Sequence, residues 1–236
     1  MEKLVYCLWR AEDDPREEFC ARLRTTLADE LHGLGARRLR VYVADPAVDA
    51  GSKLRLTSLD AHKEGFVTFW LECSQDRGAL ERRIAAAARR IAGYLVVESR
   101  PMIAEEPPAP GRRSPGWVQV TGIAPKEGLS YEEFLRHWYD VHRAVAIETQ
   151  SSTGYVRNEI VRPLTEDAPG WSAIVEETFP LGALDDPRIF YDARGSEERF
   201  QQNSQKMFES VERFLDLTKV DAHPMSEYVL GDPARS

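Results

Sequence analysis

A proline-rich segment near the middle of this 236-residue chain separates two stretches that follow the same order of predicted elements. Residues 104–116 (AEEPPAPGRRSPG) hold four prolines and two glycines in thirteen positions. Such a composition is incompatible with a helix or a central strand, and it predicts an extended linker. The sequence therefore predicts an N-terminal half over residues 1–103, a linker over 104–116 and a C-terminal half over 117–236.

The N-terminal half alternates between strand-like and helix-like patterns. Its predicted strands are rich in β-branched and aromatic residues and cover 3–10, 38–44, 66–73 and 94–98. Apolar residues at helical spacing predict one helix from Pro15, a favoured first-turn residue, to about Leu34. A second helix is predicted by the same spacing over residues 80–91.

The C-terminal half repeats this order. Its predicted strands cover 117–123, 155–161, 171–179 and 227–230. Ser130 followed by Glu133 has the spacing of a capping box, so a helix is predicted to begin there. A strongly amphipathic pattern over 200–215 predicts the second helix.

The order β-α-β-β-α-β, present twice, is that of the ferredoxin-like split βαβ motif. One such sheet carries its helices on one face and leaves the other face apolar. Two copies in one chain can bury those bare faces against each other. We therefore predict an α+β fold in which two tandem ferredoxin-like halves form an intramolecular dimeric α+β barrel. The alternative is two independent domains joined by a flexible linker.

Charge and cysteine content exclude several classes of protein. The chain has 31 Lys+Arg against 39 Asp+Glu, so its net charge of −8 disfavours nucleic-acid binding. The three cysteines form no CxxC pair and no metal-ligand spacing, which is typical of a reducing cytoplasm. No run of 18 apolar residues predicts a membrane span. The sequence predicts a soluble cytoplasmic protein with no metal, no cofactor and no nucleotide-binding motif.

The two halves can be compared position by position along their first helices. Each of these helices begins with the triplet Glu-Glu-Phe, at 17–19 and at 132–134. Counted from that triplet, Leu23 corresponds to Trp138 and Leu27 to His142. A leucine therefore suffices for packing where the second half has an imidazole, the side chain best suited to proton transfer near pH 7. The alternative is a core histidine whose ring nitrogens are both hydrogen-bonded.

Residues 131–161 resemble the signature of the EthD family of the dimeric α+β barrel superfamily. The matching features are the EEF start, Trp138, His142, and Tyr155 with Asn158 in YVRN; AIVEETF at 173–179, DPRIFYDA at 186–193 and EYVL at 227–230 also follow the family. The resemblance implies a cofactor-free small-molecule protein with a pocket between helices and sheet. It also implies that His142 and Tyr155 are catalytic. Further candidates for substrate binding are Trp138, Asn158, Tyr139, Glu177, Trp117 and Tyr228.

Three hypotheses for function remain. The first is a lyase or isomerase that moves a proton on an aromatic or phenolic substrate, so that water, carbon dioxide or a small aldehyde can leave. The second is a haem-binding barrel with a helix histidine as iron ligand, and the third is a binding or stress-response barrel without catalysis. The expected partner is a small aromatic molecule, and a homodimer is left open.

Two further expectations concern side-chain direction. On an α-helix His137 would point about 140° away from His142, toward solvent. Glu176 and Glu177 are adjacent on one strand, so they must face opposite sides of the sheet.

Overall fold

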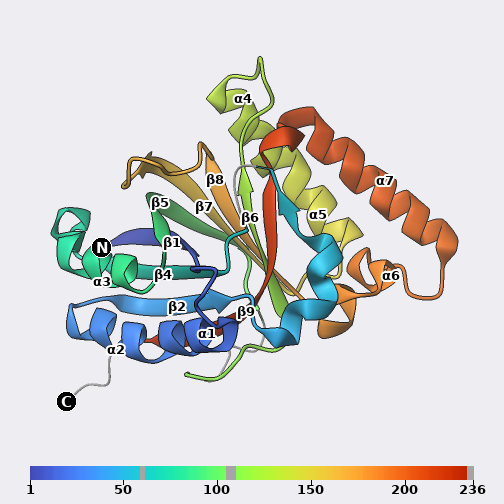
Figure 1. Cartoon of the computed structure of the whole chain (residues 1–236). Helices are drawn as coiled ribbons and strands as arrows, with labels where there is room; N and C mark the ends of the chain where they lie inside the picture. Colours follow the sequence, from blue (N-terminus) through green and yellow to red (C-terminus); the bar gives the residue numbers. More distant parts are fainter. Residues whose placement is uncertain (59–61, 105–109, 233–236) are drawn as a thin grey trace.

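The strands of this chain join in one antiparallel sheet that closes on itself. In the computed structural model, which describes residues 1–58, 62–104 and 110–232, nine strands pair in the order β2-β4-β1-β5-β7-β8-β6-β9-β3 (Figure 1). An additional pairing of β2 with β9 closes the sheet. The protein is thus an α+β barrel made of two ferredoxin-like halves, as the repeated element order predicts.

The first half supplies strands and helices with the following bounds. Its strands are β1 (Glu2–Trp9), β2 (Arg37–Val43), β3 (Leu56–Thr57), β4 (Gly65–Leu71) and β5 (Arg90–Met102). Its α-helices are α1 (Arg16–Arg24), α2 (Thr26–Gly33) and α3 (Gly78–Ala86), and its 3₁₀ turns are η1 (Pro46–Leu54) and η2 (Ser74–Arg77).

The second half follows the same plan with a longer helical layer. Its strands are β6 (Trp117–Ile123), β7 (Gly154–Pro163), β8 (Ala173–Phe179) and β9 (Asp221–Gly231). Its helices are α4 (Tyr131–Arg136), the π-helical segment η3 (His137–His142), α5 (Arg143–Thr149), α6 (Pro187–Phe190) and α7 (Glu197–Phe214). The 3₁₀ turns are η4 (Leu181–Leu184) and η5 (Leu217–Lys219).

Several element boundaries differ from the sequence-based expectation. The predicted helix over 15–34 is interrupted at Thr25, where the backbone leaves helical geometry. The predicted helix over 80–91 ends at Ala86, and Ile91 belongs to β5. Of the predicted linker, residues 105–109 lie outside the described part of the chain. Its later part runs beside β9, with a bridge between Arg113 and Tyr228. The division of the chain into halves at this segment stays a prediction.

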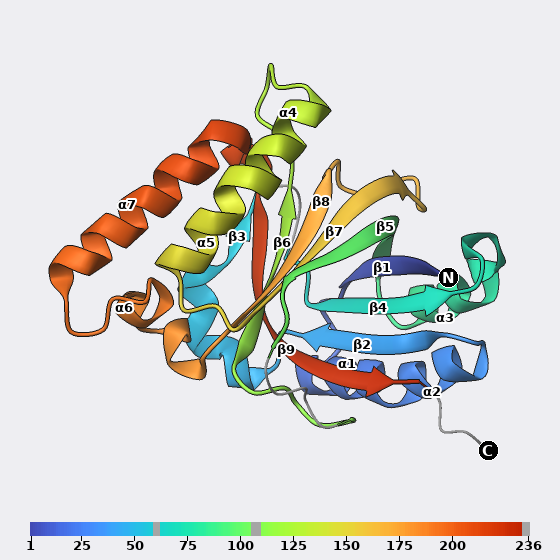
Figure 2. The same ribbon diagram turned by 180° about the vertical axis from the view of Figure 1, so that it is seen from behind.

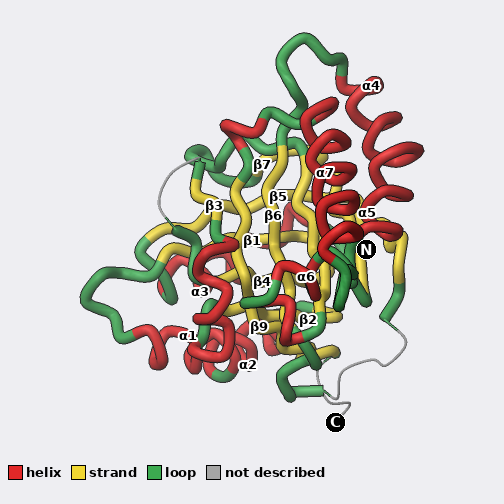
Figure 3. The backbone as a smooth tube through the Cα atoms, turned by 90° about the vertical axis from the view of Figure 1, so that its right-hand side faces the viewer, coloured by secondary structure: helices red, strands yellow, loops and turns green. Residues whose placement is uncertain are grey.

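The two helix layers cover opposite sides of the barrel. Helices α1–α3 pack on the outer face of the first half's strands, and α4, α5 and α7 on that of the second (Figures 1 and 2). In the side view the strands lie between these layers (Figure 3). The inner faces of the two half-sheets share one apolar cluster, which includes Cys7, Tyr42, Phe66, Val118 and Met225. The halves therefore have a common core, and the alternative of two independent domains is wrong.

A buried ionic network lies inside the barrel, beside this core. Glu176 accepts hydrogen bonds from Lys3 Nζ (3.2 Å), Tyr42 OH (2.6 Å) and Asn158 Nδ2 (2.8 Å). Burial alone would raise the pKa of Glu176, but the charges of Lys3 and Arg40 and these hydrogen bonds lower it to about 2. Glu176 is therefore ionised at neutral pH, and its charge is compensated mostly by the first half of the chain.

Lys3 is the cation on which this network depends, because its ammonium also contacts Glu98 at 2.7 Å. Lys3→Met should destabilise the protein by about 3 kcal/mol, since it leaves the buried carboxylate of Glu176 without its hydrogen-bonded cation, whereas the partly exposed Glu98 keeps its ion pair with Arg100. Lys206→Met removes an exposed ion pair with Glu148 and should cost less than about 1 kcal/mol. Denaturant unfolding of both variants measures the difference. Equal losses for the two would contradict a structural role for the network.

Candidate functional site

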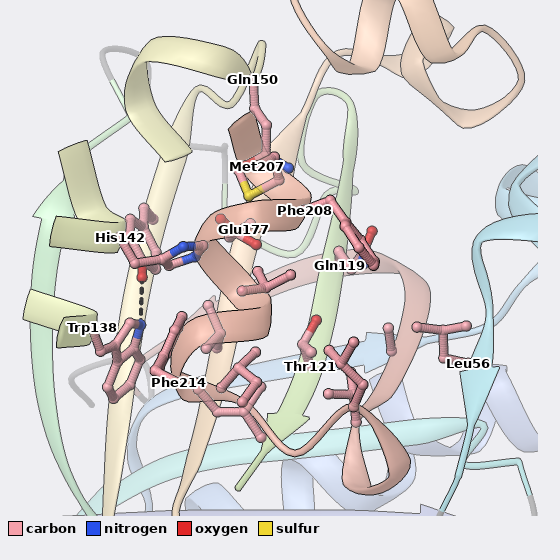
Figure 4. Close-up of a pocket in the computed structure, with 18 of the residues that line it drawn as sticks. Leu56, Gln119, Thr121, Trp138, His142, Gln150, Glu177, Met207, Phe208 and Phe214 are labelled. Atoms are coloured by element: carbon pink, nitrogen blue, oxygen red, sulfur yellow. Dashed lines mark hydrogen bonds between the residues drawn. The ribbon is translucent and has the colours of Figure 1, made fainter. Parts of the chain in front are cut away.

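A cavity of about 470 Å³ lies between the second half's sheet and its helices (Figure 4). Its walls are mostly apolar and aromatic. The side chains around it are Leu56, Gln119, Thr121, Ile123, Trp138, His142, Gln150, Tyr155, Val175, Glu177, Phe190, Tyr191, Met207, Phe208, Val211, Phe214, Leu215, Leu217, Val220 and Ala222. Its size and lining are typical of a small-molecule site.

The floor of the cavity consists of cross-strand neighbours on the outer face of the sheet. Tyr155 of β7 is opposite Glu177 of β8, and Glu177 is opposite Gln119 of β6. The next row on this face places Val175 opposite Thr121. Side chains two residues apart on a strand share a face, so both rows point toward the helices.

His142 belongs to the wall that the first helix of this half provides. That helix changes from α-helical to π-helical geometry over η3, where backbone hydrogen bonds run from i to i+5. Residues five apart in the sequence consequently lie near one another on the same side of the helix. The rings of His137 and His142 both lie against Phe214 of α7, with centroids 5.1 and 4.9 Å from its ring. The expectation that His137 points away from His142 is therefore wrong, because it assumed α-helical spacing.

Among the described residues, His142 forms one side-chain hydrogen bond, which joins it to the opposite helix. Its Nδ1 lies 3.0 Å from Oγ of Ser210, a buried residue of α7. Burial, and secondarily the neighbouring His137, lowers the pKa of His142 to about 4. The imidazole is therefore neutral at pH 7. Its Nε2 has no hydrogen-bond partner in the described part of the chain, and the ring lines the cavity (Figure 4).

Glu177 is the carboxyl group of the same cavity. Burial raises its pKa to about 7, so at neutral pH the acid and the carboxylate are both populated. Its strand neighbour Tyr155 accepts a hydrogen bond from Trp138 Nε1 at 2.8 Å (Figure 4). Burial and the charge of Glu177 raise the pKa of Tyr155, which therefore stays protonated. The structure thus brings four of the sequence-derived candidates together: His142, Tyr155, Trp138 and Glu177.

Asn158 lies on the other side of the sheet. Its side-chain amide donates to the Ile174 carbonyl (3.0 Å) and to Glu176 (2.8 Å), inside the barrel. Asn158 is three residues from Tyr155 on the same strand, and an odd separation places two side chains on opposite faces. The expectation that both line one pocket is therefore not met, and Asn158 belongs to the ionic network.

Tyr139 and Trp117 lie near the cavity but do not line it. The Tyr139 hydroxyl donates to Glu159 at 2.7 Å, on the solvent side of the helix. Trp117 is buried in a stack with Phe179 and Phe190, whose ring centroids are 5.1 and 6.4 Å from its own. It therefore supports the cavity wall through Phe190 instead of contacting the cavity itself.

Tyr228 is far from His142 in the fold. It packs into the hydrophobic cluster beneath the first half's helices, where its hydroxyl donates to Asp45 at 3.0 Å. The guanidinium of Arg24 lies 4.6 Å from its ring centroid. Tyr228 is thus a packing residue of the other helix layer, because β9 crosses from one half to the other through its pairing with β2.

Four polar residues of the site were missed by the sequence reasoning. Ser210 comes from a different helix, and no local pattern pairs it with His142. Gln119, Thr121 and Gln150 line the cavity, and each has a buried side-chain oxygen without a hydrogen-bond partner among the described residues. Gln119 and Thr121 could have been found, since they alternate with apolar residues in WVQVTGI on the face that packs under helices.

Comparison with known proteins identifies the domain and the fold. The EthD domain profile matches residues 126–218, which lie in the second half of the chain. The chain is similar in structure to an anthrone oxidase-like protein, with a TM-score of 0.55 and 10% identity over 100% of this chain and 96% of the other. It is also similar to a protein from Fusobacterium nucleatum proposed to be a monooxygenase, with a TM-score of 0.51 and 10% identity over 97% and 92% of the two chains. No curated protein sequence matches.

At this level of identity the two solved structures establish the barrel fold alone. The match to the EthD domain agrees with the sequence features around Trp138 and His142, both of which lie within its limits. None of the helices in residues 1–58, 62–104 and 110–232 combines the length and the apolar character that a membrane-spanning helix needs.

The hydrogen bond between His142 and Ser210 can be tested by stability measurements. His142→Leu should cost about 1–3 kcal/mol, because it leaves the buried Ser210 hydroxyl without its partner. In the double variant His142→Leu/Ser210→Ala, the free energy of unfolding should lie within about 1 kcal/mol of the wild-type value, since a leucine fills the equivalent position, Leu27, in the other half. Leu27→His should be strongly destabilising because its imidazole would be buried in an apolar cluster. A double variant as unstable as Leu27→His would show that His142 is needed for packing.

Proposed function

We propose that this protein is an enzyme that binds an aromatic or phenolic molecule in the cavity and transfers a proton on it, so that water, carbon dioxide or a small aldehyde leaves. The observation that carries the proposal is that His142 and Glu177 line the same cavity with pKa values displaced in opposite directions. Two titratable groups separated in this way are suited to act as base and acid in one reaction.

The shape and polarity of the cavity favour a planar aromatic substrate. Among the described residues, six Phe, Tyr or Trp side chains line it: Trp138, Tyr155, Phe190, Tyr191, Phe208 and Phe214. Such rings bind other rings by stacked or edge contacts. The low-polarity surroundings also strengthen the interactions of the few polar groups with the reacting atoms.

The protonation state of each group determines its role in the proposed reaction. In the tautomer whose Nδ1–H donates to Ser210 Oγ, His142 presents the Nε2 lone pair, which accepts a proton from the substrate hydroxyl or from a carbon next to a carbonyl. The electron pair released expels the leaving group, and protonated Glu177 supplies a proton to a departing hydroxide, which leaves as water. The imidazolium and carboxylate so formed attract each other. Proton exchange with solvent then restores the neutral imidazole and the protonated carboxyl group. The Tyr155 hydroxyl orients the substrate oxygen.

A haem group does not fit this cavity. Haem carries two propionates, which proteins usually bind with arginine or lysine side chains. The described residues around the cavity include neither, and they add a further carboxyl group, Glu177. A lining without a cation instead suits an uncharged or weakly acidic aromatic ligand.

The name of one structural neighbour suggests a suitable probe. Anthrone is a tricyclic aromatic ketone whose enol is a phenol, so exchange of its methylene hydrogens for deuterium reports the proton-transfer step alone. The protein should accelerate this exchange, and His142→Leu and Glu177→Gln should each slow it by about 100-fold or more. Tyr139→Phe, which lies outside the cavity, is the control and should leave the rate unchanged. The rates can be followed by NMR.

The pH dependence follows from the two shifted pKa values. Activity requires neutral His142 and protonated Glu177, so the rate should be maximal between about pH 4 and 7. The rate should fall above pH 7 as Glu177 ionises, and below pH 4 as His142 becomes protonated.

Uptake of oxygen during the assay would show that the proton transfer belongs to an oxygenation reaction and not to an elimination. Tight binding of anthrone with no acceleration by wild-type protein would contradict the enzymatic proposal and support a binding barrel.

A further inference from the structure

Strand β6 presents two side-chain oxygens to the cavity that no protein group satisfies. Oε1 of Gln119 and Oγ1 of Thr121 are both buried, and neither has a hydrogen-bond partner in the described part of the chain. Both residues line the cavity, and Figure 4 shows their side chains rising from the same strand toward the helices. Buried polar atoms in folded proteins nearly always have a partner, so this pair requires an explanation.

The position of the pair separates it from Tyr155 across the floor of the cavity. Gln119 and Thr121 are two residues apart on one face of β6, and β8 lies between β6 and the strand of Tyr155. Two strand spacings amount to about 9–10 Å. A ligand that contacts the Tyr155 hydroxyl through one oxygen would therefore need a second polar group on another part of its skeleton to contact Gln119 or Thr121.

The chemistry of the two side chains limits what that second group can be. An amide oxygen only accepts hydrogen bonds, and a threonine hydroxyl can accept one and donate one. The carboxyl group of Glu177, next to Gln119 in the same row, disfavours an anionic ligand group at this point. A neutral hydroxyl satisfies these conditions, because it donates to Gln119 Oε1 and can accept from the threonine.

We propose that Gln119 and Thr121 form a second binding subsite that selects aromatic substrates carrying a further hydroxyl group, on a part of the skeleton away from the oxygen that contacts Tyr155. The inference rests on the proposed function, since it assigns a role to another part of the same cavity. The subsite explains why polar residues occupy a strand face that otherwise packs under an apolar helix layer. It also orients the substrate, because a hydroxyl held at β6 fixes which end of a two-ring skeleton lies against Tyr155.

Two probes that differ by one hydroxyl group test the subsite directly. 2-Naphthol and 2,7-dihydroxynaphthalene share one ring system, and their affinities for the wild-type protein can be compared by calorimetry. The diol should bind about tenfold more tightly, the effect of one additional satisfied hydrogen bond. In the Gln119→Leu/Thr121→Val variant the diol should lose this advantage, while 2-naphthol should keep its affinity within about threefold. Gln205→Leu, on the exposed face of α7, is the matched control and should behave as wild type.

The outcomes separate the subsite from the proposed function. Equal affinities for the two probes in the wild-type protein, or a preference for the diol that survives in the double variant, would overturn the subsite alone. A wild-type protein that binds neither probe would overturn the proposed function and the subsite with it. Melting temperature gives a readout without ligand: it should stay the same or rise in the double variant, because no protein hydrogen bond is lost. A fall of several degrees would mean that both residues serve the fold.

Discussion

Backbone pairing of the two halves along β5–β7 and β2–β9 closes the barrel and sets which face of each half-sheet points inward. This pairing turns the two half-sheets toward each other, so that side chains on their inner faces pack together. Apolar side chains and the Glu176 network line that surface, and Trp171 enters it over Gly122, where a Cβ atom would lie 2.2 Å from the indole. The cavity that holds His142 and Glu177 lies instead on the outer face of a half-sheet, beneath a helix layer.

The two helix layers show how one architecture yields a packed face and a cavity. In the first half Leu23 and Leu27 complete an apolar cluster with the sheet. In the second half Trp138 and His142 occupy the corresponding positions, and the helix widens into π geometry between them. Wider spacing lets both histidine rings meet Phe214 and brings His142 to Ser210 on α7. The irregular turn thus places a neutral imidazole at the cavity wall, which is a common use of π-helical segments.

The sequence predicted the barrel because repeated element order and apolar alternation are local signals that the closed sheet preserves. Comparing the halves singled out His142, and strand alternation required one of Glu176 and Glu177 to face outward. The same alternation separates Asn158 from Tyr155, but the family resemblance grouped the two, and the group was wrong for Asn158. The π-helical segment and the contact with Ser210 depend on packing between helices distant in the sequence. No local pattern encodes them.

One cavity reverses the ordinary order of ionisation of a glutamate and a histidine. NMR titration of isotope-labelled protein measures this directly, with Glu177→Gln and His142→Leu variants to assign the two signals. The carboxyl of Glu177 should titrate near pH 7, and the imidazole of His142 should stay neutral down to about pH 4. A glutamate signal that titrates near pH 4.5, together with a histidine signal near pH 6.5, would show that both groups are solvated and would contradict the account.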